Sequence, residues 1–552
     1  SLSRIKSNQM NEGYSPKDLK FGDEGRARLI EGITKMSNAV KSTLGPSGQT
    51  VLIESPHHTH GITVTKDGVT VAKAVDLVDP VENLAVRMMK EAAERTATSA
   101  GDGTTTAIVL TECLVTEGLE LLSSEPSLNK TKVLRHLVSF TGDVIESLKK
   151  RSRPLTKKMM LDVATISANS DEAVGKIIAD VYNKVGKTGL VTVEKSQTSE
   201  TTFETTTGLK VDRGYATALF INNHKKDECV YDDCLVLVSD AEIVNIHSIE
   251  PIISHILPTG KRLLIIAPCG QQLVNTLAAN VMKNGLKICT IQPPSFGYRQ
   301  HELMQDIALS VGATYFSEAT GDDLSLMTPE DLGHVDKIIV GKESTVLLKS
   351  KSKESDAIKA RVSELKGAAA LSTQKGDKDF ILSRIASLTG GIGVIRVGGN
   401  TDLEQKELFD RVDDAVCAVR SALEEGILPG GGVALYNESQ KLEIKIKNKE
   451  YESKDEEAAA TILAEALCSP ICQIIINSGG CFADVYETGM NIHPKEGFGF
   501  DVKNAKYGDL IEMGIIDPLK VTRVALQNAV SVAVSILSTN AIITMARTYE
   551  QS

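Results

Sequence analysis

The sequence of 552 residues has no excess of basic residues and no disulfide-like cysteine pattern. It carries 72 acidic against 61 basic residues, a net charge of −11, and no basic stretch with interleaved aromatic residues. Because this charge would repel a polyanion, we expect no nucleic acid partner. The nine cysteines include no C-x-x-C pair and stand mostly in apolar runs. They predict a reducing, cytoplasmic environment rather than a disulfide framework.

Segments that would direct the chain to a membrane are also missing. Residues 1–22 are polar and have no apolar core region, so we expect a flexible tail and no secretory signal. The longest uncharged run, Val524–Met545, could span a bilayer by length, but it contains Gln527 and Asn528. These polar groups would be costly in lipid, so we predict a buried core helix that ends near the "STN" of residues 538–540, and no membrane partner.

Common nucleotide and metal motifs are incomplete. The stretch "NKVGKTG" at 183–189 contains Gly-Lys-Thr, but Val181 stands where a phosphate loop needs glycine. No complete G-x-G-x-x-G is present, which argues against a dinucleotide fingerprint or a kinase glycine loop. His57, His58 and His60 have no cysteine or second histidine pair nearby at ligand spacing. A polar hairpin tip is therefore favoured over a metal site there.

The pattern along the chain indicates a multi-domain protein with helical and α/β parts, and the length alone predicts about three or four domains. Residues 23–148 show helical spacing, interrupted by an extended pair near 50–54 and 62–65. In residues 207–340 apolar runs such as "CLVLVSD", "RLLIIAP", "LKICTIQ" and "DKIIVG" alternate with helical segments, as in an α/β layer. The charged stretch 341–388 predicts a helical hairpin, and helix resumes after "TGGIGVIRVGG".

The stretch "SAGDGTTTAIVL", residues 99–110, combines a carboxylate between two glycines with three threonines. Three β-branched residues begin a helix poorly, so helix propensity does not explain them. A helix N-terminus lined with hydroxyls suits a phosphate, and Asp102 would repel phosphate unless a divalent cation lay between them. The stretch therefore predicts a metal-nucleotide site. The alternative is an ordinary capped helix with Asp102 or Thr104 as N-cap.

A second carboxylate stands on the helix predicted for residues 403–425. Its apolar stripe comprises Leu408, Val412, Ala415, Val416, Val419 and Leu423. Asp414 follows Val412 by two residues, about 200° around the helix at ~100° per residue, so it points away from that stripe. It is either solvated or faces a functional site.

Several glycine-rich turns follow in a specific order: "TLGPSG" at 43–48, "TKDG" at 65–68, "GDGTTT" at 101–106, "LPGGGVAL" at 428–435 and "GIIDP" at 514–518. With "TISANSDEAVGK" and "DRGYATALFIN", this order resembles the group I chaperonins over nearly the whole chain, as a divergent member. The resemblance implies a chaperonin fold of three domains. It places an equatorial ATP-binding domain at 1–148 and 425–552, an α/β intermediate hinge at 149–206 and 393–424, and an α/β apical domain at 207–392.

The resemblance also implies a site for ATP and Mg²⁺. Asp102 would bind the metal, Asp517 the ribose, and Asp414 would position the attacking water, with Asp67 as a second catalytic residue. Because the resemblance places Asp414 and the phosphate loop on different domains, we expect hydrolysis to require domain closure. The other nucleotide-binding residues implied are Thr43, Leu44, Gly45, Pro46, Lys66, Gly103, Thr104, Thr105, Thr106 and Gly431.

On the substrate side, the resemblance implies a homo-oligomeric ring, sevenfold and single or double, that captures unfolded client proteins. Its apolar groove would contain Tyr215, Leu219, Phe220, Ile253 and Val274. Glu250 replaces a usual leucine, Leu219 a tyrosine, and Ala278 and Ala279 valines, so a smaller, more polar groove is expected. We expect these changes to alter the range of clients and any contact with a co-chaperonin, which in the family uses the same surface.

Three functions fit these observations to different degrees. An ATP-driven folding chamber is favoured, because Asp67, Asp102 and Asp414 are all present. A passive holdase with the same fold would show little ATP turnover. A small-molecule phosphotransferase would need an acceptor-activating His/Asp constellation, which we do not find in the sequence beyond the ATP site.

Overall fold

The computed structural model of the chain describes residues 17–54, 61–168, 171–186, 189–224, 226–349, 356–371, 375–485, 488–489 and 496–545. The chain divides into two compact units. Unit 1 comprises Ser1–Ala179, Lys195–Thr201 and Val397–Ser552, and unit 2 comprises Asp180–Glu194 and Thr202–Arg396. Each unit has its own large apolar core. The predicted hairpin tip with His57, His58 and His60 lies outside the described residues.

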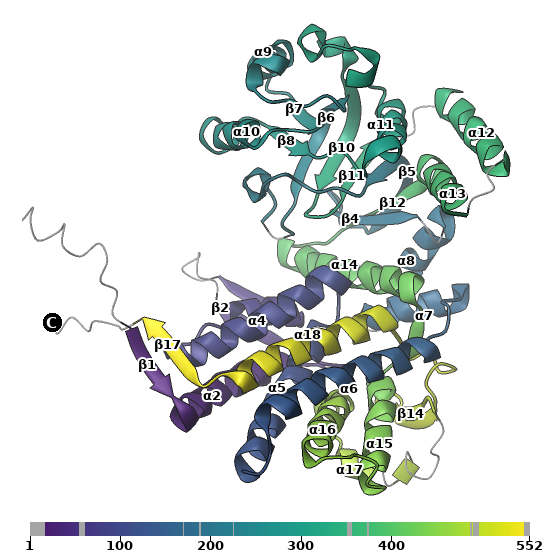
Figure 1. The fold of residues 1–552 in the computed structure, drawn as a ribbon. Helices are drawn as coiled ribbons and strands as arrows, with labels where there is room; N and C mark the ends of the chain where they lie inside the picture. Colours follow the sequence, from purple (N-terminus) through teal and green to yellow (C-terminus); the bar gives the residue numbers. More distant parts are fainter. Residues whose placement is uncertain are drawn as a thin grey trace, which may run out of the picture. The chain divides into compact units, whose positions relative to one another are not determined.

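Unit 1 is mainly helical (Figure 1). Sequence signals set the start of several helices: the Asp79 carboxylate accepts hydrogen bonds from the Val81 and Glu82 N–H groups, directly before Pro80. Its helices include α2 (Gly22–Lys41), α3 (Gly68–Ala74), α4 (Pro80–Ala100), α5 (Thr104–Ser124), α6 (Lys130–Arg151), α7 (Lys157–Ser167), α14 (Asp402–Glu425), α15 (Val433–Lys447), α16 (Lys454–Asn477), α17 (Phe482–Val485) and α18 (Leu519–Ser538). Helix α8 (Glu172–Val185) continues from unit 1 into unit 2.

Helix α18 packs against α4, α5 and α6 in the core of unit 1. By length and composition alone, α16 and α18 could cross a membrane, yet 56% and 61% of their apolar windows are buried inside the protein. The predicted core helix is therefore confirmed up to Ser538. The helix ends at the predicted "STN" stop signal, and beyond Asn540 the chain continues as a strand, which was not predicted.

Four two-stranded antiparallel sheets complete unit 1. They pair β1 (Lys17–Phe21) with β17 (Ala541–Met545), β2 (Val51–Glu54) with β3 (Ile62–Thr65), β13 (Ile427–Pro429) with β16 (Ile516–Pro518), and β14 (Phe498–Asp501) with β15 (Lys506–Asp509). The predicted extended pair is confirmed by β2 and β3. The prediction of a flexible tail over residues 1–22 is wrong for β1, because its partner strand comes from the other end of the chain, which a local pattern cannot reveal.

Unit 2 is built on a nine-stranded sheet of order β4-β12-β5-β11-β10-β6-β7-β8, with β9 paired to β6. Strands β6, β7 and β8 are parallel, and α9 (Glu250–Thr259) and α10 (Gln271–Asn284) connect them. This confirms the predicted alternation of strand and helix. The strands are β4 (Leu190–Lys195), β5 (Thr202–Val211), β6 (Cys229–Ser239), β7 (Arg262–Ile266), β8 (Ile288–Ile291), β9 (Tyr315–Phe316), β10 (Gly333–Val340), β11 (Thr345–Lys349) and β12 (Gly391–Val397).

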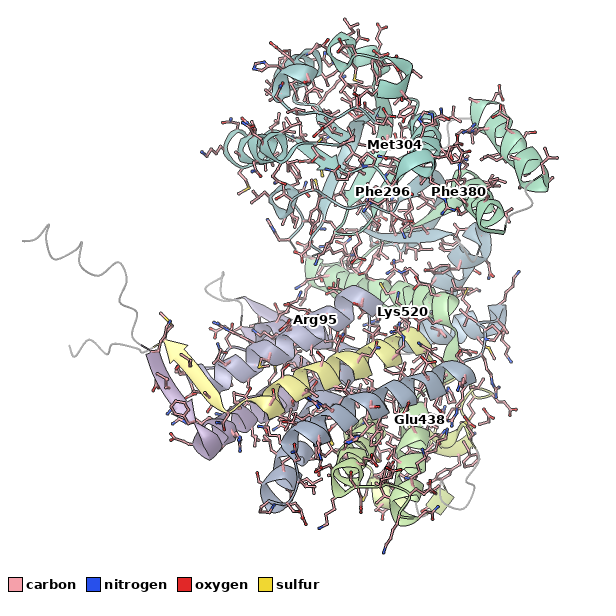
Figure 2. All side chains as sticks on the ribbon, viewed as in Figure 1. Arg95, Phe296, Met304, Phe380, Glu438 and Lys520 are labelled. Carbon is pink, nitrogen blue, oxygen red and sulfur yellow. The ribbon has the colours of Figure 1, made fainter. Side chains whose placement is uncertain are left out.

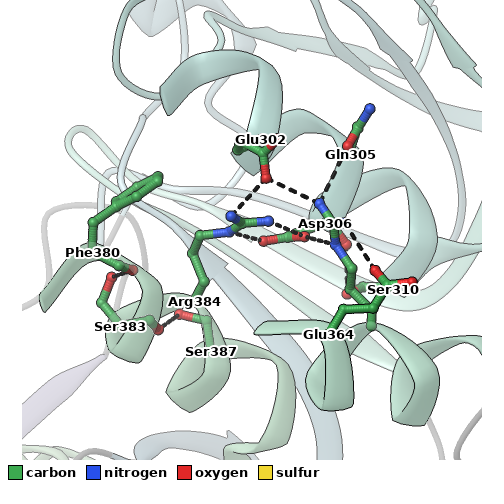
Figure 3. Close-up of polar contacts among 10 residues, drawn as sticks. Glu302, Gln305, Asp306, Ser310, Glu364, Phe380, Ser383, Arg384 and Ser387 are labelled. Carbon is green, nitrogen blue, oxygen red and sulfur yellow. Dashed lines mark hydrogen bonds and ion pairs between the residues drawn. The ribbon is translucent and has the colours of Figure 1, made fainter. Parts of the chain in front are cut away.

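The predicted helical hairpin is present as α12 (Asp356–Leu371) and α13 (Lys375–Thr389), but the prediction is wrong at the start of the stretch 341–388, where Thr345–Lys349 form strand β11 and pair with β5 and β10. A buried ion network ties it to α11 (Gly297–Val311), as Figure 3 shows. The Arg384 guanidinium donates to both carboxylate oxygens of Asp306, at 2.6 and 2.9 Å, and pairs with Glu302 at 2.7 Å. Met304 of α11, labelled in Figure 2, is buried in the core of unit 2. Helix α11 thus joins the core and the hairpin.

The predicted fold class, a multi-domain protein with α and α/β parts, is confirmed by the mainly helical unit 1 and the α/β unit 2. The finer division into three domains, with 149–206 and 393–424 as a hinge, stays a prediction.

Candidate functional site

The loop between α4 and α5 presents the N-terminus of a long helix. Gly101 and Gly103 both have left-handed backbones, with φ of 75° and 86°, and Gly103 is the N-cap of α5, with no side-chain cap hydrogen bond. The alternative in which Asp102 or Thr104 caps the helix is therefore wrong. The first N–H groups of α5 have no partner within the helix, and the buried Thr104 hydroxyl has no hydrogen-bond partner among the described residues. Both features suit an anion.

Asp102 is held in place in this loop from two sides. Its carboxylate accepts a hydrogen bond from the Gly103 N–H at 2.6 Å and another from the Ser167 hydroxyl, at the end of α7, at 2.9 Å. Burial raises the pKa of Asp102, and the nearby charge of Asp67 raises it further. A bound cation would stabilise the ionised form of this buried carboxylate.

Asp67 comes from a second helix N-terminus next to the first. Its carboxylate caps α3 and accepts hydrogen bonds from the Val69 and Thr70 N–H groups at 3.1 and 2.9 Å. The two helix ends are in close contact, since a Cβ on Gly68 would lie 2.1 Å from Thr105 Oγ1. Asp67 thus has a structural role as a cap, and its predicted catalytic role stays a prediction.

Asp414 is brought to the same place by α14. The hydroxyl of Ser421 donates to the Ala100 carbonyl at 3.0 Å, and Cys417 packs directly against Gly101. Burial raises the pKa of Asp414 well above its usual range, and the charges of Asp102 and Asp67 raise it further. Of the two alternatives for Asp414, the structure therefore favours the one in which it faces a functional site.

A single pocket contains most of these groups. It is lined by Thr65, Lys66, Asp67, Gly68, Val69, Gly101, Asp102, Thr104, Thr105, Ser167, Glu407, Asp410, Arg411 and Asp414. Five of these, Val69, Ser167, Glu407, Asp410 and Arg411, were not among the predicted site residues and lie outside the glycine-rich turns. Ser167 stands in the quoted stretch "TISANSDEAVGK", and Glu407, Asp410 and Arg411 precede Asp414 at helical spacing, but the sequence assigned none of them a role in the site. The Nε of Arg411 is buried and has no hydrogen-bond partner within the part of the chain that the structure describes.

The remaining predicted nucleotide residues do not line this pocket. In the β13–β16 pair Asp517 lies opposite Leu428, and the Gly430 N–H donates to the Ile515 carbonyl at 2.9 Å, which brings Gly431 close to Asp517. Burial and the nearby charge of Asp102 raise the pKa of Asp517 to about 7. Asp517 therefore lies close enough to Asp102 for the two charges to interact.

Helix α16 supports both the 43–46 turn and the glycine turn after β13. Asn477 Nδ2 donates to the Lys41 and Leu44 carbonyls, each at 2.9 Å. A Cβ on Gly432 would lie 2.8 Å from the Ile471 backbone nitrogen. Thr43, Leu44, Gly45 and Pro46 are thus held by the same helix that adjoins Gly431. Gly103 and Thr106 lie in the α5 N-terminus beside the lining residues.

The charges of the pocket fit a divalent cation. Its lining includes five carboxylates, Asp67, Asp102, Glu407, Asp410 and Asp414, against the cations of Lys66 and Arg411. This excess of negative charge would repel a triphosphate unless a metal ion offset it. No group of three or more His, Cys, Asp or Glu among the described residues could hold a metal ion. A divalent cation in this pocket would therefore need ligands from outside the chain, such as phosphate oxygens and water, beside a carboxylate such as Asp102.

The predicted client-binding residues are mostly not exposed. Phe220, Ile253 and Val274 are buried in the core of unit 2, and Tyr215 is half-buried, whereas Leu219 is 51% exposed. In this structure only Leu219 of the five is well exposed, and the role of all five in client binding stays a prediction. Their helices and turns pack these apolar faces against the sheet, and a sequence pattern does not distinguish such a face from a binding face.

The comparisons agree with this architecture. A model of the TCP-1/cpn60 chaperonin family matches residues 36–547. The chaperonin gp146 from the bacteriophage EL 2 (Pseudomonas aeruginosa), crystallised in the presence of ATP-BeFx, has a similar fold over 96% of this chain and 99% of its own. In crystal form II the TM-score is 0.70 at 23% identity, and in crystal form I, with the same coverage, 0.63 at 24% identity. Because the family model spans nearly the whole length, the chain belongs to the TCP-1/cpn60 chaperonin family.

Proposed function

We propose that the protein is an ATP-dependent chaperonin subunit, which binds and hydrolyses ATP in unit 1 and uses the cycle to promote folding of non-native proteins. The observation that carries this proposal is the convergence of Asp67, Asp102 and Asp414 at the adjoining N-termini of α3 and α5. Family membership supports it, as does the ATP analogue in the phage chaperonin crystals, which share this fold.

Each group in the pocket has a distinct proposed task. Asp102 holds Mg²⁺, which offsets phosphate charge when bound. The N-terminus of α5 donates hydrogen bonds to phosphate oxygens, and the 43–46 turn lies along the phosphates. Asp517 accepts hydrogen bonds from the ribose hydroxyls. Phosphoryl transfer depends on positioning and charge stabilisation more than on covalent chemistry. The proposed contribution of Asp414 is to orient the attacking water.

We propose that α14 couples this site to unit 2. The helix that carries Asp414 begins shortly after β12, a strand of the unit 2 sheet. Gln405 of α14 donates hydrogen bonds to the carbonyls of Ser196 and Val397, at 2.8 and 2.9 Å; all three residues belong to unit 1, and Ser196 directly follows β4 while Val397 ends β12. A change in the position of Asp414 on ATP binding would therefore be transmitted along the chain.

Clients would bind to exposed apolar side chains of unit 2. Leu257 on α9 is 60% exposed and Met282 on α10 is 67% exposed. Phe296, before α11, is 81% exposed and is labelled in Figure 2. Such residues offer a surface for the apolar segments of an unfolded chain.

The small sheets of unit 1 support assembly into a ring of identical subunits. Leu52 and Ile62 on the β2–β3 pair, and Phe21 and Ile543 on the β1–β17 pair, are exposed apolar residues. Two-stranded sheets with apolar faces and free edges are typical contacts between chains. We also propose a cytoplasmic location, which the nine free cysteines support.

Phosphate release by the purified chain, with and without a denatured client protein, tests the proposal. Steady ATP turnover with a higher yield of refolded client is expected. A holdase would prevent client aggregation without phosphate release, and that result would exclude the proposed ATP-driven cycle.

A further inference from the structure

Two cysteines of α16 lie side by side outside the lining of the pocket. The Sγ atoms of Cys468 and Cys472 are 3.5 Å apart, and both side chains are half-buried. Residues four apart on a helix share one face, so the helix itself brings the two thiols together. Their sequence context alone predicts only small apolar core residues.

Pro470 stands between them inside the helix. Proline has no N–H to donate, so it leaves the Ala466 carbonyl without its usual helical partner. The Ser469 hydroxyl donates to that carbonyl at 2.7 Å. The turn that carries the thiols is thus interrupted at the backbone and stabilised by a side chain.

The spacing suits a bridging ion better than a disulfide. Side chains four apart on a helix have Cβ atoms about 5–6 Å apart, whereas a disulfide needs about 3.5–4.5 Å. Two metal–sulfur bonds of about 2.3 Å, whose sulfurs are 3.5 Å apart, meet at an angle of about 100°, close to tetrahedral. We propose that Cys468 and Cys472 form a bidentate dithiol site for a thiophilic ion, with water or small thiols as its remaining ligands.

The thiols must ionise to bind an ion, and the contact between them affects the two differently: together with burial it raises the pKa of Cys468, so the second proton is lost only as the ion binds. A hydrogen bond from Cys468 lowers the pKa of Cys472, so a first thiolate forms readily. An arsenoxide serves as a probe with balanced chemistry: two As–S bonds form, and the two thiol protons leave with the oxide oxygen as water. No oxidant or reductant is required.

Occupation of this site would affect the nucleotide site, an inference that rests on the proposed function. Ile471, between the thiols, contacts the Gly432 turn, and Asn477, farther along α16, holds the Leu44 carbonyl. Both cysteines also pack against the small apolar cluster that contains Val433 and Leu510. A rigid bridge between the thiols would therefore constrain both turns, and we expect it to slow ATP turnover several-fold.

The test is intact-mass measurement of the folded, reduced chain after addition of one equivalent of phenylarsine oxide. We expect one adduct that resists excess monothiol and is removed by a dithiol. Cys468→Ser and Cys472→Ser should each reduce the yield of the adduct at least tenfold. Cys468→Ala and Cys472→Ala should reduce it to the same extent. Cys481→Ser, which removes an exposed cysteine, should retain the adduct. Cys229 and Cys289 are fully buried in unit 2 and should not compete.

An adduct that persists in either single variant, or no adduct on the wild-type chain, would overturn the dithiol site. Phosphate release is recorded in parallel. Adduct formation on a chain without ATP turnover would leave the dithiol site standing and contradict the proposed function. ATP turnover without an adduct would overturn the dithiol site and leave the proposed function standing.

Discussion

Gly101 and Cys417 come so close that no side chain fits between them, since a Cβ on Gly101 would lie 2.3 Å from Cys417 Cβ. Cys417 lies three residues beyond Asp414 on α14, and Gly101 directly precedes Asp102. This contact therefore sets the approach of one carboxylate to the other. The contact with Cys417, together with a φ of 75°, explains why residue 101 at the end of α4 is a glycine.

Gly101→Ala should destabilise the protein and slow ATP turnover. The left-handed backbone costs alanine about 1–2 kcal/mol, and overpacking against Cys417 adds about 1–3 kcal/mol. Urea denaturation should therefore show a loss of about 2–5 kcal/mol in the free energy of unfolding. Gly142→Ala is the matched control, because a Cβ there meets nothing within 4 Å and a helical alanine is favoured. Equal stability of the two variants would contradict the contact.

Asp414→Ala should retain ATP binding and lose hydrolysis. A group that orients the attacking water contributes about 10²–10⁴-fold to the rate, while its removal relieves repulsion among the pocket carboxylates. Calorimetric ATP binding and phosphate release measure the two effects separately. Asp402→Asn, at the exposed start of α14, serves as the control. Loss of binding and hydrolysis to the same extent would exclude the assigned role.

Ser167→Ala should weaken the response to Mg²⁺. The Ser167 hydroxyl donates to Asp102 at 2.9 Å and favours its ionised form. Without this bond, the apparent Mg²⁺ affinity should fall about 10-fold, as is typical when the partner of a metal ligand is removed. The measurement is phosphate release titrated with Mg²⁺. Ser167→Thr keeps the hydroxyl and should restore much of the affinity, so an unrescued loss would indicate a general packing defect instead.

Asp517 should make the nucleotide-free protein less stable as the pH rises. Its carboxyl has a pKa of about 7 in the folded chain against 3.8 normally, so the folded state binds the proton more tightly than the unfolded state does. The stability that this proton contributes is full below pH 4 and lost as the pH rises to about 7. Asp517→Asn should remove roughly 1–3 kcal/mol of this decline. Denaturant melts from pH 4 to 8 measure it, and an unchanged slope would contradict the burial of the acid.

Local patterns predicted much of the fold because the determining contacts are near in sequence. Apolar runs such as "RLLII" identified strand β7, and the 3–4 spacing identified the long helices. Strand β1 could not be predicted in this way, because it pairs with residues from the other end of the chain. Burial of Phe220 and Val274 was missed for a similar reason: an apolar face looks the same whether it packs on a sheet or binds a client.

For the candidate site, the sequence supplied the residues but not their distances. The order of the turns led to Asp67, Asp102, Asp414 and Asp517 through a family resemblance, while spacing alone left Asp414 undecided. The role of Ser167 was not found, although it stands in the quoted stretch "TISANSDEAVGK", because that role depends on α7 ending beside the α4–α5 loop. Tertiary packing, rather than any local motif, creates that hydrogen bond.

In the proposed function, Asp102 holds a metal ion that allows ATP to bind among carboxylates. The most direct test is the ATP dissociation constant of the wild-type chain and of Asp102→Asn, each with and without Mg²⁺. If Asp102 holds the metal ion, Mg²⁺ should lower the ATP dissociation constant at least tenfold in the wild type and should have little effect on it in the variant. Equal dependence on Mg²⁺ in both proteins, or no ATP binding by the wild type, would contradict it.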